Sequence, residues 1–286
     1  MSFILKLRYF IMLPLLVLTL ISSPKASSTD TAELLSEDVF VADQALMMGQ
    51  GITTDGEYYY TSGAITALKF NILAKFNADD FTLADVSVNP LPDKCKERGN
   101  DHIGGISLYD GKLYTSVEGP DEGYPCIVVY DAETLSHTGE IYDLPVEIYD
   151  DGVPWCAVDK NTGYLYASKW SDAESIYVYD VNNSMALVRE IKLTGIGVID
   201  RIQGGEFLDG VLYLSNDIHD NGNIKNILKV DVTTGEVSLA AERNVGGENV
   251  EAEGMTFTTD ENGTVMHVLD YNKIIGVFVR HYKVNF

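Results

Sequence analysis

Gly105–Ser116, with the sequence GISLYDGKLYTS, is the stretch that decides the fold. Two short apolar segments flank the pair Asp110-Gly111. An Asx-Gly pair between apolar strands is the strongest short-range signal for a β-hairpin, because glycine adopts positive φ without steric cost. The stretch therefore predicts two antiparallel strands joined by a tight turn.

The same hairpin recurs four more times along the 286-residue chain. The copies are Gly51–Ser62, Ala157–Ser168, Gly205–Ser215 and Gly254–Leu269. Each copy precedes an apolar third strand, and four of the five then give a weaker fourth strand. Third strands are expected at Ile72–Leu83, Ile127–Leu135, Ile176–Ser184, Ile227–Gly235 and Ile274–Tyr282. An anchor residue in the second strand marks the period: Tyr60, Tyr114, Tyr166, Tyr213 and Met266 follow one another at spacings of 54, 52, 47 and 53.

Four strands repeated about every 50 residues are the signature of a β-propeller. We therefore predict an all-β protein with one propeller domain over residues 27–286, built from five four-stranded blades. A β-sandwich is the alternative, but it would not repeat the same unit in order. Six blades are the variant to weigh, if Phe40–Leu46 and the C-terminus form a degenerate blade. With five blades, Glu37–Leu46 would supply the outer strand that closes the ring beside the last blade.

Residues 1–26 have the pattern of a secretory signal peptide. Lys6 and Arg8 precede an apolar run from Tyr9 to Ile21, and small residues lead to a cleavage point near Ala26. A membrane anchor is the alternative, but this run of about 13 residues falls short of the ~20 needed to span a bilayer. We therefore expect a soluble, secreted mature protein, extracellular or periplasmic, with no membrane span.

The chain is strongly acidic, with 43 Asp and Glu, 20 Lys and Arg, and a formal net charge of −23. Removal of residues 1–26 would take away three basic residues and no acidic ones, leaving a charge of −26. A nucleic-acid-binding surface needs clustered Lys and Arg, so this composition excludes a nucleic-acid partner. The charge favours solubility, or else a cationic ligand drawn in by the field.

Propeller topology predicts where a site would lie. The start of each inner strand and the loop between the second and third strands should open on the same face. At the inner strands this face would carry Gln50, His102, Trp155, Gln203 and Glu253, and in the loops Glu118, Asp121, Glu122, Trp170, Asn216, Asp217, His219 and Asp270. Convergent polar groups beside an aromatic wall are the usual form of a ligand pocket.

Three of these residues are candidates for catalysis. His102 would act as a general acid or base, with Glu118 or Glu253 as its partner. The structural alternative is a histidine hydrogen-bonded to a neighbouring blade. Trp155 and Trp170 are the only tryptophans, and they would stack on a sugar, a ring or a peptide, or else pack between blades.

Glu253 is also the best candidate for a metal ligand. Together with Gln50, Gln203 and backbone carbonyls, it would offer the hard oxygen donors that Ca²⁺ prefers. No CxxC or HxxxH spacing occurs, so the sequence has no zinc pattern.

Cys95, Cys126 and Cys156 are an odd number of cysteines for an exported protein. All three map to the same expected face. A disulfide between Cys95 and Cys126 would tie two loops of one blade and is the first choice, and Cys126–Cys156 is the alternative. The remaining thiol is expected to be buried and inert rather than catalytic.

Short motifs resemble the glutamine cyclotransferase family, secreted five-bladed propellers that cyclise N-terminal glutamine. Gln50-Gly51 followed by Tyr60-Thr61-Ser62 is similar to that family's opening hairpin, and Gly205–Tyr213 with Ile227–Val237 resembles its fourth blade. The resemblance spans most of residues 45–282. The family's catalytic Glu-Gly at the second inner strand is replaced here by Gly104-Gly105, so His102 or Glu118 would have to substitute for it. Glu253-Gly254-Met255 is similar to metal-binding propellers of the phytase and SdiA-regulated types.

The leading hypothesis is an exported, monomeric propeller whose acidic face binds a small molecule, peptide or glycan, with Ca²⁺ as the candidate cofactor. An enzyme is the second hypothesis, either a metal-assisted hydrolase or an acyl or amide transferase. A protein-interaction scaffold is the third. Fold alone does not decide among them.

Overall fold

The computed structural model describes residues 31–42, 44–65, 68–119, 124–196, 198–217, 225–243, 245 and 249–286. The signal peptide expected at residues 1–26 lies outside these ranges. None of the helices in the described part of the chain is long and apolar enough to cross a membrane.

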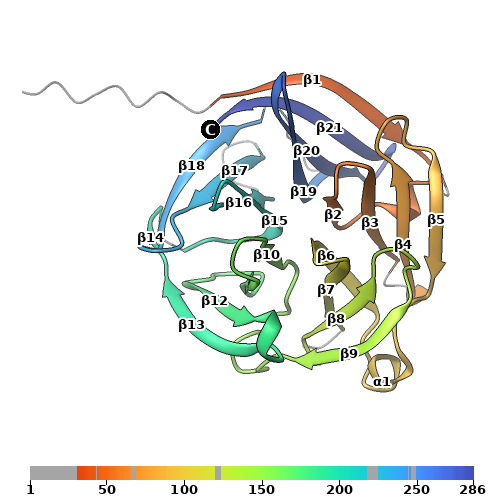
Figure 1. The fold of residues 1–286 in the computed structure, drawn as a ribbon, viewed down its shortest axis with the longest axis vertical. Helices are drawn as coiled ribbons and strands as arrows, with labels where there is room; N and C mark the ends of the chain where they lie inside the picture. The colour runs from red at the N-terminus through yellow and green to blue at the C-terminus, as the bar shows by residue number, and fades with distance from the viewer. Residues whose placement is uncertain are drawn as a thin grey trace, which may run out of the picture.

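Five antiparallel sheets surround a central axis, as Figure 1 shows, and each sheet is one blade. Blade 1 contains β2 (Ile52–Thr54), β3 (Tyr58–Ile65), β4 (Phe70–Asn77) and β5 (Leu83–Val88). Blade 2 contains β6 (His102–Tyr109), β7 (Lys112–Glu118), β8 (Cys126–Asp131) and β9 (His137–Asp143). Blade 3 contains β10 (Ala157–Asp159), β11 (Tyr164–Ala167), β12 (Ser175–Asp180) and β13 (Ala186–Lys192). The five-bladed prediction is confirmed.

The last two blades follow the same plan. Blade 4 contains β15 (Ile202–Leu208), β16 (Val211–Asn216), β17 (Asn226–Val230) and β18 (Glu236–Glu242), with β14 (Thr194–Gly195) pairing parallel to β18. Blade 5 contains β19 (Val250–Asp260), β20 (Gly263–Asn272), β21 (Gly276–Asn285) and β1 (Thr31–Phe40). Short helical turns occur at η1 (Ala45–Met47), α1 (Asp93–Glu97) and η4 (Val181–Asn183), outside the sheets.

The N-terminal strand β1 closes the ring as the outermost strand of blade 5 (Figure 1). It pairs antiparallel with β21, with Phe40 opposite Val277. Two side-chain contacts reinforce this pairing: Arg280 Nε lies 3.1 Å from Glu37 Oε2, and His281 Nε2 lies 2.9 Å from Asp38 Oδ2. The expected closing strand is therefore present, but it spans Thr31–Phe40 rather than Glu37–Leu46, and Ala45–Met47 forms the turn η1 instead.

The hydrophobic core is divided into five clusters, one between each pair of neighbouring blades. The anchor tyrosines belong to these clusters. Tyr60 packs with blade 2, Tyr114 with blade 3, Tyr166 with blade 4 and Tyr213 with blade 5. Burial of large apolar side chains between blades contributes about 25 cal/mol per Å² of apolar area, so it is the contact between blades that holds the ring together.

Candidate functional site: the mouth of the central channel

The strand register shows which inner-strand residues are equivalent. Gly254 N donates to Gln50 O at 2.7 Å, and Gly105 N donates to Pro154 O at 2.8 Å, so the same backbone contact joins blade 5 to blade 1 and blade 2 to blade 3. On this register Gln50, Gly104, Pro154, Gln203 and Glu253 occupy one level of the axis. Three of the predicted site residues, Gln50, Gln203 and Glu253, are therefore at equivalent positions.

Glycines let the backbones of the inner strands approach closely at this level. A Cβ on Gly104 would lie 2.6 Å from Pro154 O, and a Cβ on Gly204 would lie 2.6 Å from Gly254 Cα. Contacts this short do not occur for real side chains, so only glycine fits at either position. The channel is consequently narrow where the polar side chains gather.

Glu253 is the only acidic residue among these five equivalent inner-strand positions. Its side chain is buried, with 2% exposed, and it accepts no hydrogen bond from any residue that the structure describes. Burial raises its pKa well above the ordinary value, and the nearby acids Glu251, Asp217 and Asp270 raise it further. Buried charges are normally paired or hydrogen-bonded. The charged form of Glu253 would therefore be stabilised by a positively charged or hydrogen-bond-donating partner.

Glu206 gives the contrasting case one level further along the axis. It is equally buried, and its pKa is also raised by burial. Its oxygens, however, accept hydrogen bonds from the Thr53 and Thr256 hydroxyls, each at 3.3 Å, and from Phe207 N at 3.0 Å. The oxygens of Glu206 thus accept hydrogen bonds within the protein, whereas Glu253 accepts none from a described residue.

His102 and Glu118 are register partners on the first two strands of blade 2. His102 Nε2 lies 2.8 Å from Gln50 Oε1, and burial lowers the pKa of this histidine to about 4. Burial raises the pKa of Glu118 to about 7, although its Oε2 accepts a hydrogen bond from Val153 N at 2.8 Å. The structure thus pairs a neutral histidine with an amide. The carboxyl opposite the histidine in the strand register titrates near neutrality and is held by the Val153 backbone.

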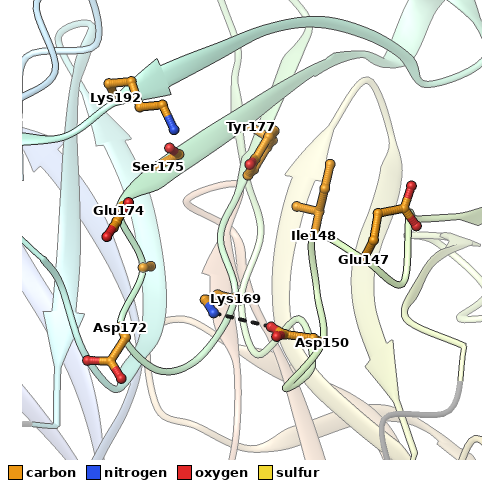
Figure 2. A pocket seen from close by; sticks show the side chains of 10 residues that line it. Glu147, Ile148, Asp150, Lys169, Asp172, Glu174, Ser175, Tyr177 and Lys192 are labelled. Atoms are coloured by element: carbon orange, nitrogen blue, oxygen red, sulfur yellow. Dashed lines mark hydrogen bonds and ion pairs between the residues drawn. The ribbon is translucent and has the colours of Figure 1, made fainter.

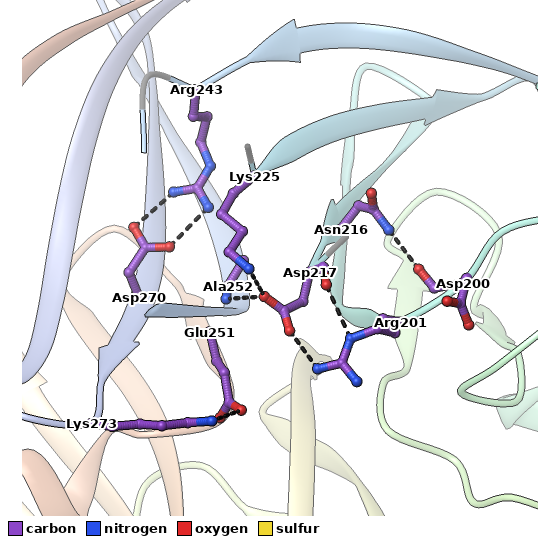
Figure 3. A network of polar contacts seen from close by, with 10 residues as sticks. All are labelled: Asp200, Arg201, Asn216, Asp217, Lys225, Arg243, Glu251, Ala252, Asp270 and Lys273. Atoms are coloured by element: carbon purple, nitrogen blue, oxygen red, sulfur yellow. Dashed lines mark hydrogen bonds and ion pairs between the residues drawn. The ribbon is translucent and has the colours of Figure 1, made fainter. Parts of the chain in front are cut away.

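Asp217 is the centre of a buried ionic network at the edge of this site (Figure 3). Its Oδ1 lies 2.5 Å from Lys225 Nζ and accepts a hydrogen bond from Ala252 N at 2.9 Å. Its Oδ2 accepts a hydrogen bond from Arg201 Nη2 at 2.7 Å. Lys225 and Asp217 both have 0% side-chain exposure, so this carboxylate joins blade 4 to blade 5.

Asp270 is paired in a similar way with two arginines. Arg243 donates to both of its oxygens at 2.8 Å, and Arg280 Nη1 donates to Oδ2 at 2.5 Å. Sequence reasoning missed these buried cations, because nothing local in the chain marks Arg243 or Lys225 as a partner of a distant carboxylate. Isolated basic residues in a strongly acidic chain were the one available signal.

The remaining candidates lie around this network or away from it. Trp155 has 0% exposure and packs in the core between blades 3 and 4, where its Nε1 donates to Ser168 Oγ at 3.0 Å. Trp170 is partly buried, with the Arg201 guanidinium 4.7 Å from its ring centroid. Asn216 Nδ2 donates to Asp200 O at 2.6 Å. Asp121, Glu122 and His219 lie outside the described residues.

Two cavities open near these elements. One, of about 360 Å³, lies at blade 3. Figure 2 shows Lys169 paired with Asp150 among its lining residues, and Lys169 Nζ lies 3.2 Å from Asp150 Oδ1. The other, of about 300 Å³, is lined by Gln50, Leu46, Ile274 and Ile275, with Lys273 at its edge. The second cavity therefore adjoins the channel mouth through Gln50.

Within the described residues, no group of three or more His, Cys, Asp or Glu side chains is arranged to hold a metal ion. The oxygen donors at the level of Glu253 are its own carboxyl, the amides of Gln50 and Gln203, and backbone carbonyls. Ca²⁺ takes six to eight oxygen ligands, usually with several carboxylates. This donor set fits a cation held largely by one carboxyl better than a fully enclosed Ca²⁺ site.

No protein-family model matches the chain, and no curated protein matches it. Among solved structures, the RS223 β-xylosidase has a TM-score of 0.54 and 10% identity, over 87% of this chain and 94% of that one. The tail fiber of Staphylococcus aureus phage P68 also has a TM-score of 0.54, with 17% identity over 87% of this chain and 52% of that one.

Hydrazine synthase from Kuenenia stuttgartiensis has a TM-score of 0.45 and 12% identity, over 81% of this chain and 59% of that one. This chain thus spans little more than half the length of the tail fiber and the synthase chains. At such low identities the similarity extends to the fold alone. The five blades of this structure themselves define the class of protein, a five-bladed β-propeller.

Proposed function

We propose that this propeller binds a ligand that presents a positively charged group to Glu253 at the mouth of the central channel. The observation that carries the proposal is the buried Glu253 carboxyl, which has no hydrogen-bond partner among the described residues and several acids nearby. A cation seated there would offset both the burial of the carboxylate and the repulsion from its neighbours. The negative charge of the chain would favour its approach.

A metal ion and an organic ammonium group share this chemistry. Gln50 and Gln203, at positions equivalent to Glu253, would add amide oxygens for Ca²⁺ or accept hydrogen bonds from an ammonium. The ammonium of a peptide or small molecule is the better match to a single carboxyl, because Ca²⁺ needs more oxygen ligands.

A thermal melt of the purified chain tests the proposal. The probes are Ca²⁺ after EDTA treatment, and triglycine compared with its N-acetylated form, which lacks the ammonium. A ligand at a hundredfold excess over Kd stabilises by about 2.7 kcal/mol and raises the Tm by a few degrees. We expect a shift with Ca²⁺ or triglycine that is lost in Glu253→Gln and kept in Glu206→Gln. Absence of a shift with both probes would contradict the proposal.

Acid–base catalysis at the same mouth is the second candidate function. Glu118, whose pKa is raised to about 7, can both give and take a proton near neutral pH, and His102 is its partner across the strands. Turnover of lactones, phosphate esters or N-terminal glutaminyl peptides, governed by a group of pKa near 7 and lost in Glu118→Gln, would support an enzyme. A flat pH profile in the wild type would not.

A protein-binding role is favoured by one surface feature. Ile274 and Ile275, at the turn between β20 and β21, are 77% and 52% exposed and line the cavity beside Gln50. Exposed apolar clusters mark interaction sites. If this surface binds a protein that carries the cationic group, Ile274→Glu would abolish binding of that protein. Binding of Ca²⁺ and triglycine would stay intact.

A further inference from the structure

Cys95 and Cys126 are brought together in the core between blades 1 and 2, although they are 31 positions apart in the chain. Cys95 lies on α1 and Cys126 begins β8, and both have 0% exposure. The two thiols are close enough for each to shift the pKa of the other. All three cysteines are free thiols here.

Cys156 is separated from this pair. It belongs to the core between blades 2 and 3, where its thiol donates to the Tyr114 carbonyl oxygen at 3.4 Å. Burial raises its pKa to about 12. The geometry therefore distinguishes between the two pairings that the sequence left open, and it favours Cys95 with Cys126.

Arg98 lies beside this thiol pair. Its Nη1 donates to Asp143 Oδ1 at 2.5 Å, and Asp143 is the register partner of Cys126. Its Nε and Nη2 are buried and have no hydrogen-bond partner among the described residues, and the nearby Arg98 charge lowers the pKa of Cys95. A thiolate at Cys95 would give these N–H groups a charged acceptor, which they otherwise lack.

The two sulfurs are not equivalent. Cys126 and the nearby Arg98 lower the pKa of Cys95, and Cys95 together with burial raises the pKa of Cys126. The thiolate is the nucleophile in disulfide exchange, so Cys95 is the sulfur suited to attack and Cys126 the sulfur suited to resolve.

We propose that Cys95 and Cys126 form a thiol–disulfide couple in which Cys95 attacks and Arg98 stabilises the reduced form. Because Cys95 is buried, the attack follows a local opening of α1. The Cys95 thiolate then displaces one thiolate from a low-molecular-weight disulfide such as oxidised glutathione, giving a mixed disulfide. Cys126 then loses its proton, attacks Cys95 Sγ and releases the second thiolate. Two protein thiols are oxidised, and one external disulfide is reduced to two thiols.

The arginine determines the polarity of the couple. Its positive charge favours the thiolate. Once the disulfide forms, Asp143 remains the partner of Nη1, whereas the buried Nε and Nη2 have no charged acceptor. A disulfide whose reduced form is stabilised is more oxidising. The Cys95–Cys126 disulfide should consequently be easier to reduce than an ordinary structural disulfide, and α1 would be tethered to blade 2 only under oxidising conditions.

The first test uses the full chain and its Cys156→Ser variant. Both are equilibrated in glutathione redox buffers and alkylated under denaturing conditions, and their masses are measured by intact-protein mass spectrometry. We expect both proteins to lose two alkylation sites on oxidation, and peptide mapping to show Cys95 linked to Cys126. Retention of both thiols in oxidised glutathione, with the fold confirmed by circular dichroism, would overturn the proposal. So would a Cys126–Cys156 link in the wild type.

The second test separates the role of Arg98 from simple packing. Arg98→Gln removes the charge and Arg98→Lys keeps it. We expect Arg98→Gln to shift the equilibrium about tenfold toward the disulfide, equivalent to about 30 mV, and Arg98→Lys to restore most of the wild-type value. Equal equilibrium constants in all three proteins would contradict the assigned role of Arg98.

Discussion

His102 Nε2 lies 2.8 Å from Gln50 Oε1, so a histidine of blade 2 and a glutamine of blade 1 meet by a hydrogen bond at the channel mouth. An amide oxygen only accepts, and the histidine must therefore carry its proton on Nε2. The pair defines a neutral, oriented imidazole beside Glu118 rather than a charged one.

We expect His102 to remain neutral down to about pH 4, because burial lowers its pKa to that value. Gln50→Glu would put a carboxylate against Nε2 and raise the pKa of His102 by at least about one unit. Histidine ¹H–¹³C spectra recorded across pH 3–8 measure both effects, with the His102 signal assigned by its loss in His102→Asn. A wild-type His102 signal that titrates between pH 6 and 7 would contradict the burial argument.

Removing the Asp217 carboxylate should be costly. Asp217→Asn would leave Lys225, with 0% exposure, without its anionic partner, and would weaken the contact with Arg201. Breaking a buried ion pair in this way costs about 3–5 kcal/mol. Urea denaturation measures the loss.

The matched control is Asp93→Asn. Asp93 lies 4.0 Å from Lys96 in an exposed pair, with side-chain exposures of 94% and 48%. Exposed pairs contribute at most about 1 kcal/mol. Similar losses for the two variants would show that burial does not set the strength of the Asp217 network.

Local sequence patterns predicted most of the fold. Asx-Gly turns and alternating apolar strands specify each hairpin without reference to distant residues. A closing outer strand before blade 1 was correctly expected, although only Glu37–Phe40 of the expected Glu37–Leu46 belongs to it. The fifth anchor was wrong by one residue. Thr256 pairs with His267 as Glu206 pairs with Tyr213, so His267 rather than Met266 is the equivalent of the anchor tyrosines. β19 and β20 are the longest hairpin strands. The turn between them therefore lies further from the anchor position than in the other blades, and it no longer indicates the register.

The site was predictable in position and less so in its contacts. Gln50, Gln203 and Glu253 could be placed at the starts of inner strands, because strand order follows from the repeat; that they bind a ligand remains a prediction. Their surroundings depend on pairs between blades. Asp270 with Arg243 joins β20 to the chain after β18, and such a pair leaves no periodic trace in the sequence.

Glu253 should make stability depend on pH. Its pKa is raised in the folded chain, so the folded state binds the proton more tightly than the unfolded state. The contribution of Glu253 is therefore most favourable below pH ~4.5 and is lost as the pH rises toward the raised value. Glu253→Gln should raise the free energy of unfolding at pH 8 by about 2 kcal/mol and have little effect at pH 4.

Glu206→Gln is the control for that experiment. Glu206 uses its oxygens to accept three hydrogen bonds, and an amide would direct N–H groups at some of those donors. We expect it to lower stability at pH 8 rather than raise it. Urea titrations at pH 4 and pH 8 measure both variants, and destabilisation by Glu253→Gln at pH 8 would mean that this carboxylate already has a partner.

The narrow channel depends on Gly254. A Cβ at this position would lie 2.7 Å from Ile52 N and 2.8 Å from Gly51 Cα, and both are backbone atoms that cannot rotate away. Gly254→Ala should therefore force blades 5 and 1 apart and destabilise the ring by about 3 kcal/mol. Gly49→Ala is the matched control in the same region, because its Cβ would meet no atom closer than 3.7 Å. Urea denaturation of both variants checks the prediction, and equal stability would mean that the inner strands have room to separate.

Gly254→Ala should also weaken ligand binding at the channel mouth. Because the Gln50–Gly254 backbone hydrogen bond lies at the same contact, the Tm shift produced by Ca²⁺ or triglycine should become smaller.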